Sequence, residues 1–315
     1  MSKYVRHAIG CGLVLASLYC AGCIHKISSS VQPFSQAVAL TATNVQGAFE
    51  TVQRAYCDAR TMNYAVSYTG TNGFDPGTLC QTWITPETLA ARALVLQGLK
   101  QYASELSSLT ASDISSVDTA STALGKSLTE LTGTAPFKKV AAEAKVPDQI
   151  ATTAVDALGI WLIQSKLQKE LPAIIIKMDD PIQQISQLLI ADIGTVGADS
   201  EHPSVGSGLR QVLWIQYGEE IRSWDLYVSK NYFGKDVSPD SRFAAIKQLV
   251  SLSVQRRAAD QTLAQVAVTI KQMAHAHTEL VKAAKAKQPL TADVSDLLAE
   301  AQRLNSYYNS LEKSK

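Results

Sequence analysis

Apolar residues recur at alternating intervals of three and four along residues 31–66, and this spacing is the strongest constraint on the fold. The series runs Val31, Phe34, Val38, Thr41, Val45, Ala48, Val52, Ala55, Ala59, Met62 and Val66. Such spacing lines up one face of an α-helix and is typical of a coiled-coil seam. Because a long helix with one apolar face is unstable alone in water, we expect partner helices to cover it.

Two further seams predict long helices near the carboxyl end. One runs through Ala245, Leu249, Leu252, Arg256, Ala259, Leu263, Val266, Ile270, Met273, His277, Leu280 and Ala284, and the other through Val294, Leu297, Ala301, Leu304, Tyr308 and Leu311. The first would start at Ser238-Pro239 and extend roughly 73 Å before Pro289. The fold class predicted is all-α, an elongated antiparallel helical bundle with coiled-coil-like seams.

Capping and breaking residues divide the middle of the chain. Thr85 as N-cap and Pro86 at the first helical position predict a helix to about residue 109. Other helices are expected over 112–131, 148–168, 182–193 and 209–232, with 132–147 as a connection. Pro172 and Asp180-Pro181 should kink or restart the chain, with the acidic pair Asp179-Asp180 capping the helix that follows.

The composition excludes several classes of protein. The formal net charge of +1 leaves no electrostatic footprint for nucleic-acid binding, so no nucleic-acid partner is expected. Only 17 Gly and 10 Pro in 315 residues argue against an all-β fold with many tight turns.

The amino terminus has the layout of an export signal. Lys3 and Arg6 precede a charge-free apolar run from Ala8 to Tyr19. The following Cys20-Ala21-Gly22-Cys23 resembles the lipobox of bacterial lipoproteins, although Cys20 stands where that class usually has Leu. The resemblance implies cleavage of a 1–22 signal peptide and acylation of Cys23, with palmitate among the lipids, followed by a 23–30 linker and a single helical-bundle domain over 31–315.

The lipid would anchor the protein in a bacterial cell envelope. Ile24 rather than Asp follows Cys23, which resembles the pattern for sorting to the outer membrane, with the bundle facing the periplasm. An uncleaved anchor remains an alternative, because the 17 apolar or neutral residues from Ala8 to Ile24 reach the lower limit for a membrane span.

Two cysteines remain in the mature chain once Cys23 carries lipid. In an exported protein, Cys57 and Cys80 are most simply explained as a disulfide that ties a loop around residues 70–83 to the first helix. A metal or catalytic thiol is the alternative, but no His lies nearby.

No motif predicts catalysis, so we expect no enzyme, no cofactor and no metal. Residues 120–127 fit a relaxed phosphate-loop pattern ending in Gly125-Lys126-Ser127, but no buried strand precedes them. Gly206-Ser207-Gly208 lacks the first glycine of a nucleophile elbow. His275 and His277 turn to different faces of a helix. His277 and Arg256 lie in the apolar seam, where such residues fix register or pair with a carboxylate, and the substitution His277→Leu should raise stability.

The remaining candidates are surfaces. Trp214, Tyr217, Trp224 and Tyr227 have core spacing but are residue types that also anchor interfaces. The sequence therefore favours a non-catalytic interaction or scaffold lipoprotein with an unknown envelope protein as partner, and it leaves self-association open. The alternative is a membrane-active, pore-forming-like helical protein, based on the apolar runs 154–163 and 173–176.

Overall fold

The computed structural model describes residues 5–67, 85–110, 119–164, 170–196, 207–232, 237–286 and 292–313, with the backbone alone for residues 5–29 and some residues at helix ends. All the regular structure in this part of the chain is α-helical, as the sequence predicts. In chain order the helices are α1 (Val5–Ser67), α3 (Pro86–Ser108), α4 (Thr119–Leu131), α5 (Ala135–Glu143), α6 (Asp148–Gln164), α7 (Leu171–Ile193), α8 (Gly208–Tyr232), α9 (Pro239–Ala286) and α10 (Ala292–Lys313).

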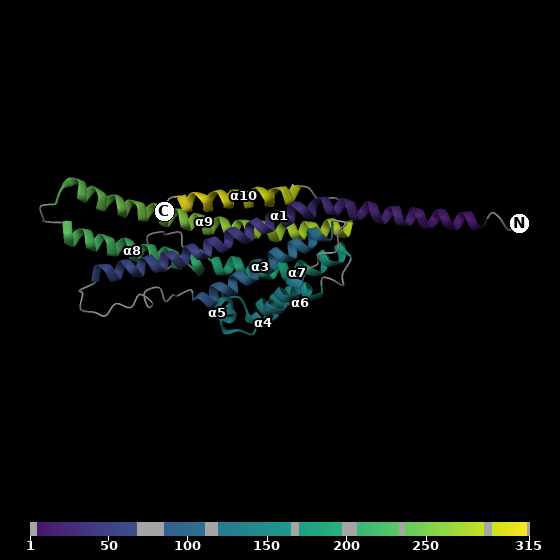
Figure 1. Cartoon of the computed structure of the whole chain (residues 1–315), viewed down its shortest axis with the longest axis horizontal. Coiled ribbons are helices and arrows are strands. Elements are labelled where there is room, and N and C mark those ends of the chain that lie inside the picture. Colours follow the sequence, from purple (N-terminus) through teal and green to yellow (C-terminus); the bar gives the residue numbers. More distant parts are fainter. Residues whose placement is uncertain are drawn as a thin grey trace.

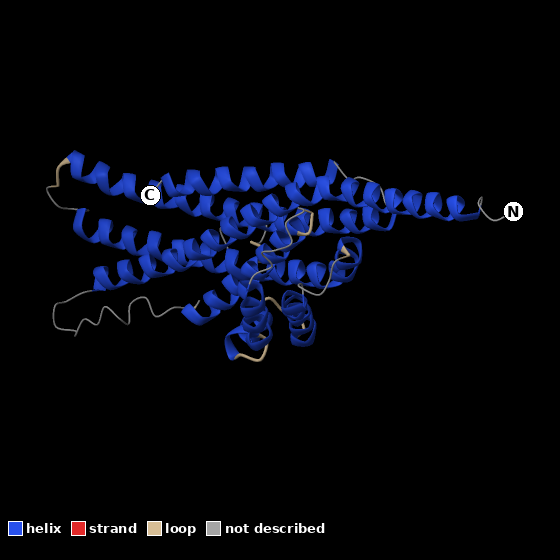
Figure 2. Cartoon of the chain, turned by 45° about the vertical axis from the view of Figure 1, so that its right-hand side comes forward, coloured by secondary structure: helices blue, strands red, loops and turns tan. Residues whose placement is uncertain are grey.

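The helices are arranged along one long axis. Helix α1 contacts α3, α8, α9 and α10, and Figures 1 and 2 show α1, α8, α9 and α10 running along the molecule. The shorter helices α4, α5 and α6 lie to one side, next to α3 and α7. The amino terminus and the end of α8–α9 lie at opposite ends of the molecule (Figure 1).

The residues of the predicted seams face the core. From Val31 to Ala59 every member of the first seam is buried, and so is every member of the α9 seam from Ala259 to Ala284. The α10 members from Val294 to Leu304 are buried as well, while Tyr308 and Leu311 lie outside the described side chains. One core joins residues from every described helix, so burial of these faces explains why the long helices form.

The cap of α3 agrees with its prediction. Thr85 is the N-cap, its side chain accepts a hydrogen bond from the Thr88 amide, and Pro86 stands in the first turn. The same chemistry produces α5, which was expected to be a connection. Thr134 accepts from the Phe137 amide at 3.4 Å with Pro136 in the first turn, and Phe137 is buried. The prediction of a connection over 132–147 was therefore wrong. The Thr-x-Pro capping signal is present in the sequence, but the helix that it begins is only nine residues long.

Helix α7 also differs from its prediction. It begins at Leu171 and continues through Pro181, where a break was expected. An internal proline removes a backbone hydrogen bond at a cost of about 3 kcal/mol. Burial of Met178, Ile182 and Ile185 in the core next to α9 offsets this cost, so packing overrides the local signal.

Candidate interaction surface

The four aromatic residues singled out on α8 divide into two pairs. Trp214 and Tyr217 are buried in the bundle, whereas Trp224 is half-buried and Tyr227 is exposed toward the end of the helix. Trp224 stacks on Tyr227 with ring centroids 5.3 Å apart, and its indole nitrogen donates to the Ala245 carbonyl of α9 at 2.9 Å. The first pair is core, and the second joins α8 to α9 where the bundle ends.

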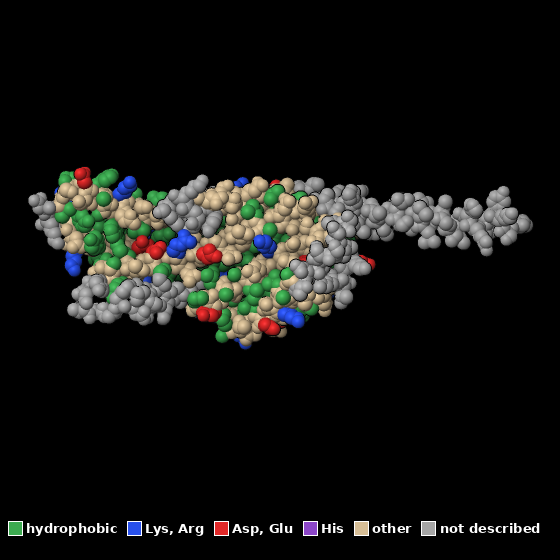
Figure 3. Space-filling view, viewed as in Figure 1, with side chains coloured by type: hydrophobic (Ala, Val, Ile, Leu, Met, Phe, Trp, Pro, Cys, Tyr) green, Lys and Arg blue, Asp and Glu red, His purple; other side chains and the backbone are tan. Residues whose placement is uncertain are grey.

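Exposed large apolar side chains gather around this second pair. We define the distal surface as Leu226 and Tyr227 of α8 with Phe243, Ile246, Val250 and Val254 of α9, all of them exposed. Figure 3 shows apolar side chains collected over the end formed by α8 and α9. Soluble proteins seldom leave so many large apolar side chains together in water without using them. This makes the distal surface the candidate interaction site.

A pair of carboxylates lies at the base of the distal end. Asp58, Glu220 and Trp224 line a cavity of about 290 Å³ between α1, α8 and α9. Burial, and then the charge of Asp58, raises the pKa of Glu220 to about 7. Burial, with the charge of Glu220 next, raises the pKa of Tyr217 to about 12.

Arg256 lies in the inward seam of α9, and among the described residues it has no carboxylate partner, which was one of the two roles expected for it. Its guanidinium carbon lies 4.2 Å from the centroid of the Trp214 ring. Burial, reinforced by the neighbouring Arg257, lowers the pKa of Arg256. Trp214 therefore holds this cation by a cation–π contact.

His277 is the centre of a buried polar chain in the middle of the bundle. Its Nδ1 lies 3.1 Å from Asp179 Oδ1, and its Nε2 lies 2.7 Å from the Tyr102 hydroxyl. The hydrogen bond from His277 is the main cause of the lowered pKa of Asp179. An ionised carboxylate only accepts, so Nδ1 donates to Asp179, and in the neutral imidazole this tautomer leaves Nε2 to accept from the Tyr102 hydroxyl.

This arrangement confirms the carboxylate partner expected for His277, and it argues against the expected benefit of His277→Leu. His277 is 0% exposed and Tyr102 is 1% exposed, so removing the imidazole would leave the tyrosine hydroxyl buried without its acceptor. His275, two residues earlier, is largely exposed and lies 3.9 Å from Glu279. The two histidines face different environments, as their spacing predicts.

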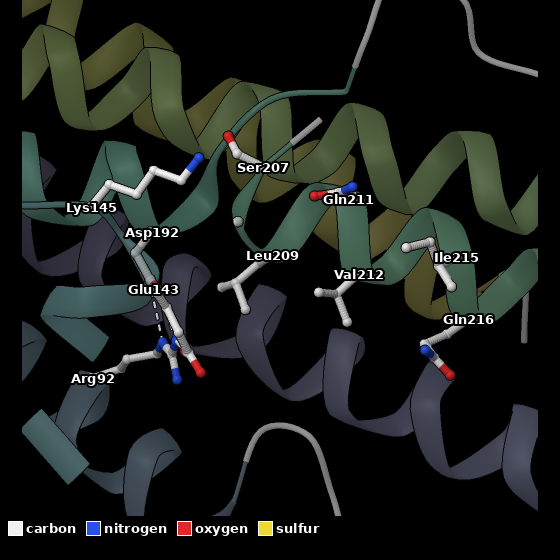
Figure 4. Close-up of a pocket in the computed structure, with 11 residues that line it drawn as sticks. Arg92, Glu143, Lys145, Asp192, Ser207, Leu209, Gln211, Val212, Ile215 and Gln216 are labelled. Atoms are coloured by element: carbon white, nitrogen blue, oxygen red, sulfur yellow. Dashed lines mark hydrogen bonds and ion pairs between the residues drawn. The ribbon is translucent and has the colours of Figure 1, made fainter. Parts of the chain in front are cut away.

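Arg92 forms the second buried polar cluster. Its Nε and Nη2 donate to the two oxygens of Asp192, both at 2.7 Å, and Nη2 also donates to Glu143 at 3.0 Å. These residues line one end of a pocket of about 350 Å³ that extends along α8 past Val212 (Figure 4). Since the two acids and the Thr88 carbonyl already occupy the guanidinium, the cluster holds α3, α5 and α7 together.

The residues of the phosphate-loop pattern and of the nucleophile-elbow candidate have structural roles. Residues 120–127 lie within α4. At Gly125 this helix approaches α6 so closely that a Cβ on Gly125 would be 2.5 Å from the Gly159 carbonyl oxygen. Ser207 exchanges backbone hydrogen bonds with Thr195 at 2.8 and 3.1 Å. Gly208 has φ +65° beside the Asp192 carbonyl, a conformation that favours glycine.

The predictions for the cysteines depend on side chains that lie partly outside the described residues. Cys23 lies in the helical backbone of α1, and its side chain is outside the described part. Cys57 is half-buried on α1, while Cys80 lies outside the described residues. Within the described residues there is no group of three or more metal-ligating His, Cys, Asp or Glu side chains. No described helix is long and apolar enough to cross a membrane.

Comparison of the chain with protein-family models, curated proteins and solved structures found no match.

Sequence reasoning identified Trp224 and Tyr227 but missed most of the distal surface. Phe243, Ile246, Val250 and Val254 are spaced three, four and four apart, so a helical stripe was visible in the sequence. This stripe overlaps the inward seam that contains Ala245 and Leu252. Apolar spacing alone does not tell which of these two faces of α9 is buried. The packing of α9 on α8 shows that the inward seam is buried and the stripe is exposed.

Proposed function

We propose that this chain is a bacterial envelope lipoprotein that works as a non-catalytic scaffold. Lipid at Cys23 holds it in the outer membrane facing the periplasm, and its distal surface binds a protein partner. The observation that carries the proposal is the exposed apolar surface at the end of the bundle opposite the amino terminus (Figure 1). An elongated molecule with a lipid anchor at one end and an exposed apolar surface at the other is suited to connecting the membrane to a partner protein.

Two finer features belong to this proposal. The long helices α1, α9 and α10 pack through coiled-coil-like seams, supported by the burial of their seam residues. A Cys57–Cys80 disulfide joins α1 to the segment before α3, and would stabilise the fold by about 3 kcal/mol. Alkylation of the unfolded protein before and after reduction, followed by mass spectrometry, tests the disulfide.

The anchor is tested by a Cys23→Ser variant. Wild-type protein should be found in the membrane fraction, with an intact mass showing loss of residues 1–22 and addition of acyl chains. The variant should leave the membrane fraction, because its anchor is covalent lipid. A variant that stays membrane-bound would contradict lipid anchoring and favour the uncleaved span.

The membrane-active alternative receives no specific support from the packing. Its apolar runs lie in α6 and α7, where Ile160 and Ile176 are exposed but most of the large apolar side chains are buried, namely Val155, Leu158, Trp161, Leu162, Ile174 and Ile175. Leakage of dye from liposomes on addition of the unacylated protein would favour this alternative over the scaffold.

A further inference from the structure

One face of α9 within the distal surface has no covering helix among the described residues. Phe243 is 69% exposed, Ile246 55%, Val250 58% and Val254 49%. Their spacing places them along one side of the helix over about three turns, or roughly 16 Å. We call these four residues the α9 stripe. It is distinct from the inward seam, whose members Ala245 and Leu252 are buried.

The charged residues beside the α9 stripe are mostly basic. Arg242, Lys247 and Arg257 are exposed, and within the described structure none of the three forms an ion pair. Asp240 is the one acidic residue in the sequence from 239 to 257. The next acid, Asp260, already accepts from Arg210 at 2.8 and 3.0 Å. On α8, Asp225 lines the pocket next to the stripe together with Arg242. The stripe therefore combines exposed apolar side chains with an excess of positive charge.

A small pocket adjoins the stripe. It lies between α8 and α9, has a volume of about 330 Å³, and is lined by apolar and polar side chains that include Val228, Tyr232, Arg242 and Ile246. A pocket of this kind next to an exposed apolar stripe can take one anchoring side chain of a partner. Ile246 belongs to both features and so joins them into one continuous surface.

We propose that the α9 stripe binds an amphipathic α-helix of another protein whose apolar face is flanked by acidic side chains. The inference rests on the proposed scaffold function and names the chemistry of its partner. A straight stripe with a neighbouring pocket fits the helix-in-groove mode of recognition. Unpaired Arg242, Lys247 and Arg257 select acidic flanks, because charge complementarity favours such a partner and opposes a basic one.

The same charges argue against a second copy of this chain on the stripe. Two copies would bring Arg242, Lys247 and Arg257 of one molecule near the same cations of the other, which is unfavourable. A bilayer is also a poorer fit than a partner helix, because the stripe lies along the side of α9 and not at the tip of that helix. The experiment described next distinguishes a second copy and a bilayer from the proposed partner helix.

The test uses the full chain reconstituted in phosphatidylcholine nanodiscs and two labelled synthetic helices of about 18 residues. Both peptides carry leucines at the spacing of the stripe, one with flanking Glu and the other with Lys in place of each Glu. Fluorescence anisotropy should show that the Glu peptide binds at least about tenfold more tightly than the Lys peptide.

Matched variants locate the binding. Val250→Glu should weaken binding of the Glu peptide by at least about tenfold, whereas Val268→Glu, on the same helix and at a similarly exposed valine, should leave it unchanged. Lys247→Glu should also weaken binding of the Glu peptide. Lys271→Glu, at an exposed lysine outside the stripe, should leave binding of that peptide unchanged. Circular dichroism should show equal helix content in all four variants.

Several results would overturn the proposal. These are absence of binding, equal binding of the two peptides, or equal loss with Val250→Glu and Val268→Glu. Binding to phosphatidylglycerol vesicles or dimerisation in sedimentation, if lost with Val250→Glu, would assign the stripe to lipid or to a second copy. Each result is independent of fractionation at Cys23, so failure here is distinguishable from failure of the lipid anchor.

Discussion

The two ends of α9 show how differently one helix can be used. Near its carboxyl end, His277 is completely buried and bonded to both Tyr102 and Asp179. Near its amino end, Phe243 stands largely in solvent. The polar side chain is inside because partners from α3 and α7 satisfy it. The apolar one is outside because no described helix covers that side of α9. We infer that the buried half maintains the fold and the exposed half makes contacts with other molecules.

The largest loss of stability is expected in the buried region at Arg92. Asp192→Ala removes both carboxylate oxygens from the guanidinium of a side chain that is only 1% exposed. Glu143 remains as a second partner of Arg92, but breaking the buried bidentate pair should still lower the free energy of unfolding by about 3–5 kcal/mol. Urea unfolding followed by circular dichroism measures this change. Lys139→Ala, which affects an exposed cation near Glu143, is the control and should change stability by less than about 1 kcal/mol.

A somewhat smaller loss is expected at His277. His277→Leu leaves the Tyr102 hydroxyl buried without an acceptor and removes the hydrogen bond to Asp179. The free energy of unfolding should fall by about 2–4 kcal/mol. Adding Tyr102→Phe should recover part of the loss, because it removes the orphaned hydroxyl. An increase in stability with His277→Leu alone would show that the buried half does not depend on this chain of hydrogen bonds.

Glu220, between the two regions, should make stability depend on pH. Its pKa is raised from 4.5 to about 7 in the folded protein, mainly by burial and then by Asp58. Between these values the unfolded state binds fewer protons than the folded state, so stability falls as pH rises. After discounting for partial solvent exposure, we expect a loss of about 1–2 kcal/mol between pH 5 and pH 8 from this group. Glu220→Gln should flatten that part of the profile, and an unchanged profile would contradict the assignment.

The smallest change in stability is expected at the distal surface. Phe243→Ser replaces a side chain that is mostly in solvent, so the free energy of unfolding should change by less than about 0.5 kcal/mol. Thermal unfolding checks this, and binding of the Glu peptide should nevertheless weaken. A loss of several degrees in melting temperature would show that Phe243 is part of the fold and would remove the contrast between the two ends of α9.

Much of the fold was predictable because long helices leave a repeated signal. The seam that begins at Val31 and the cap at Thr85 are sequence features with direct structural consequences. Pro181 misled the prediction because burial of its neighbours on α7 outweighs a lost hydrogen bond. The Arg92–Asp192 pair joins residues a hundred positions apart, and no local pattern reveals such a pairing. For the candidate site, Trp224 and Tyr227 were found by residue type, while the α9 stripe was hidden by the overlapping inward seam.

The central claim is that the distal surface contacts a partner while the rest of α9 does not. The most direct test places a photo-crosslinking amino acid at position 250 or at position 268 and irradiates intact cells that make the full chain. We predict one discrete cross-linked protein from position 250, mapped by mass spectrometry to a helical segment with acidic flanks, and none from position 268. The same products from both positions, or none from position 250, would contradict the account.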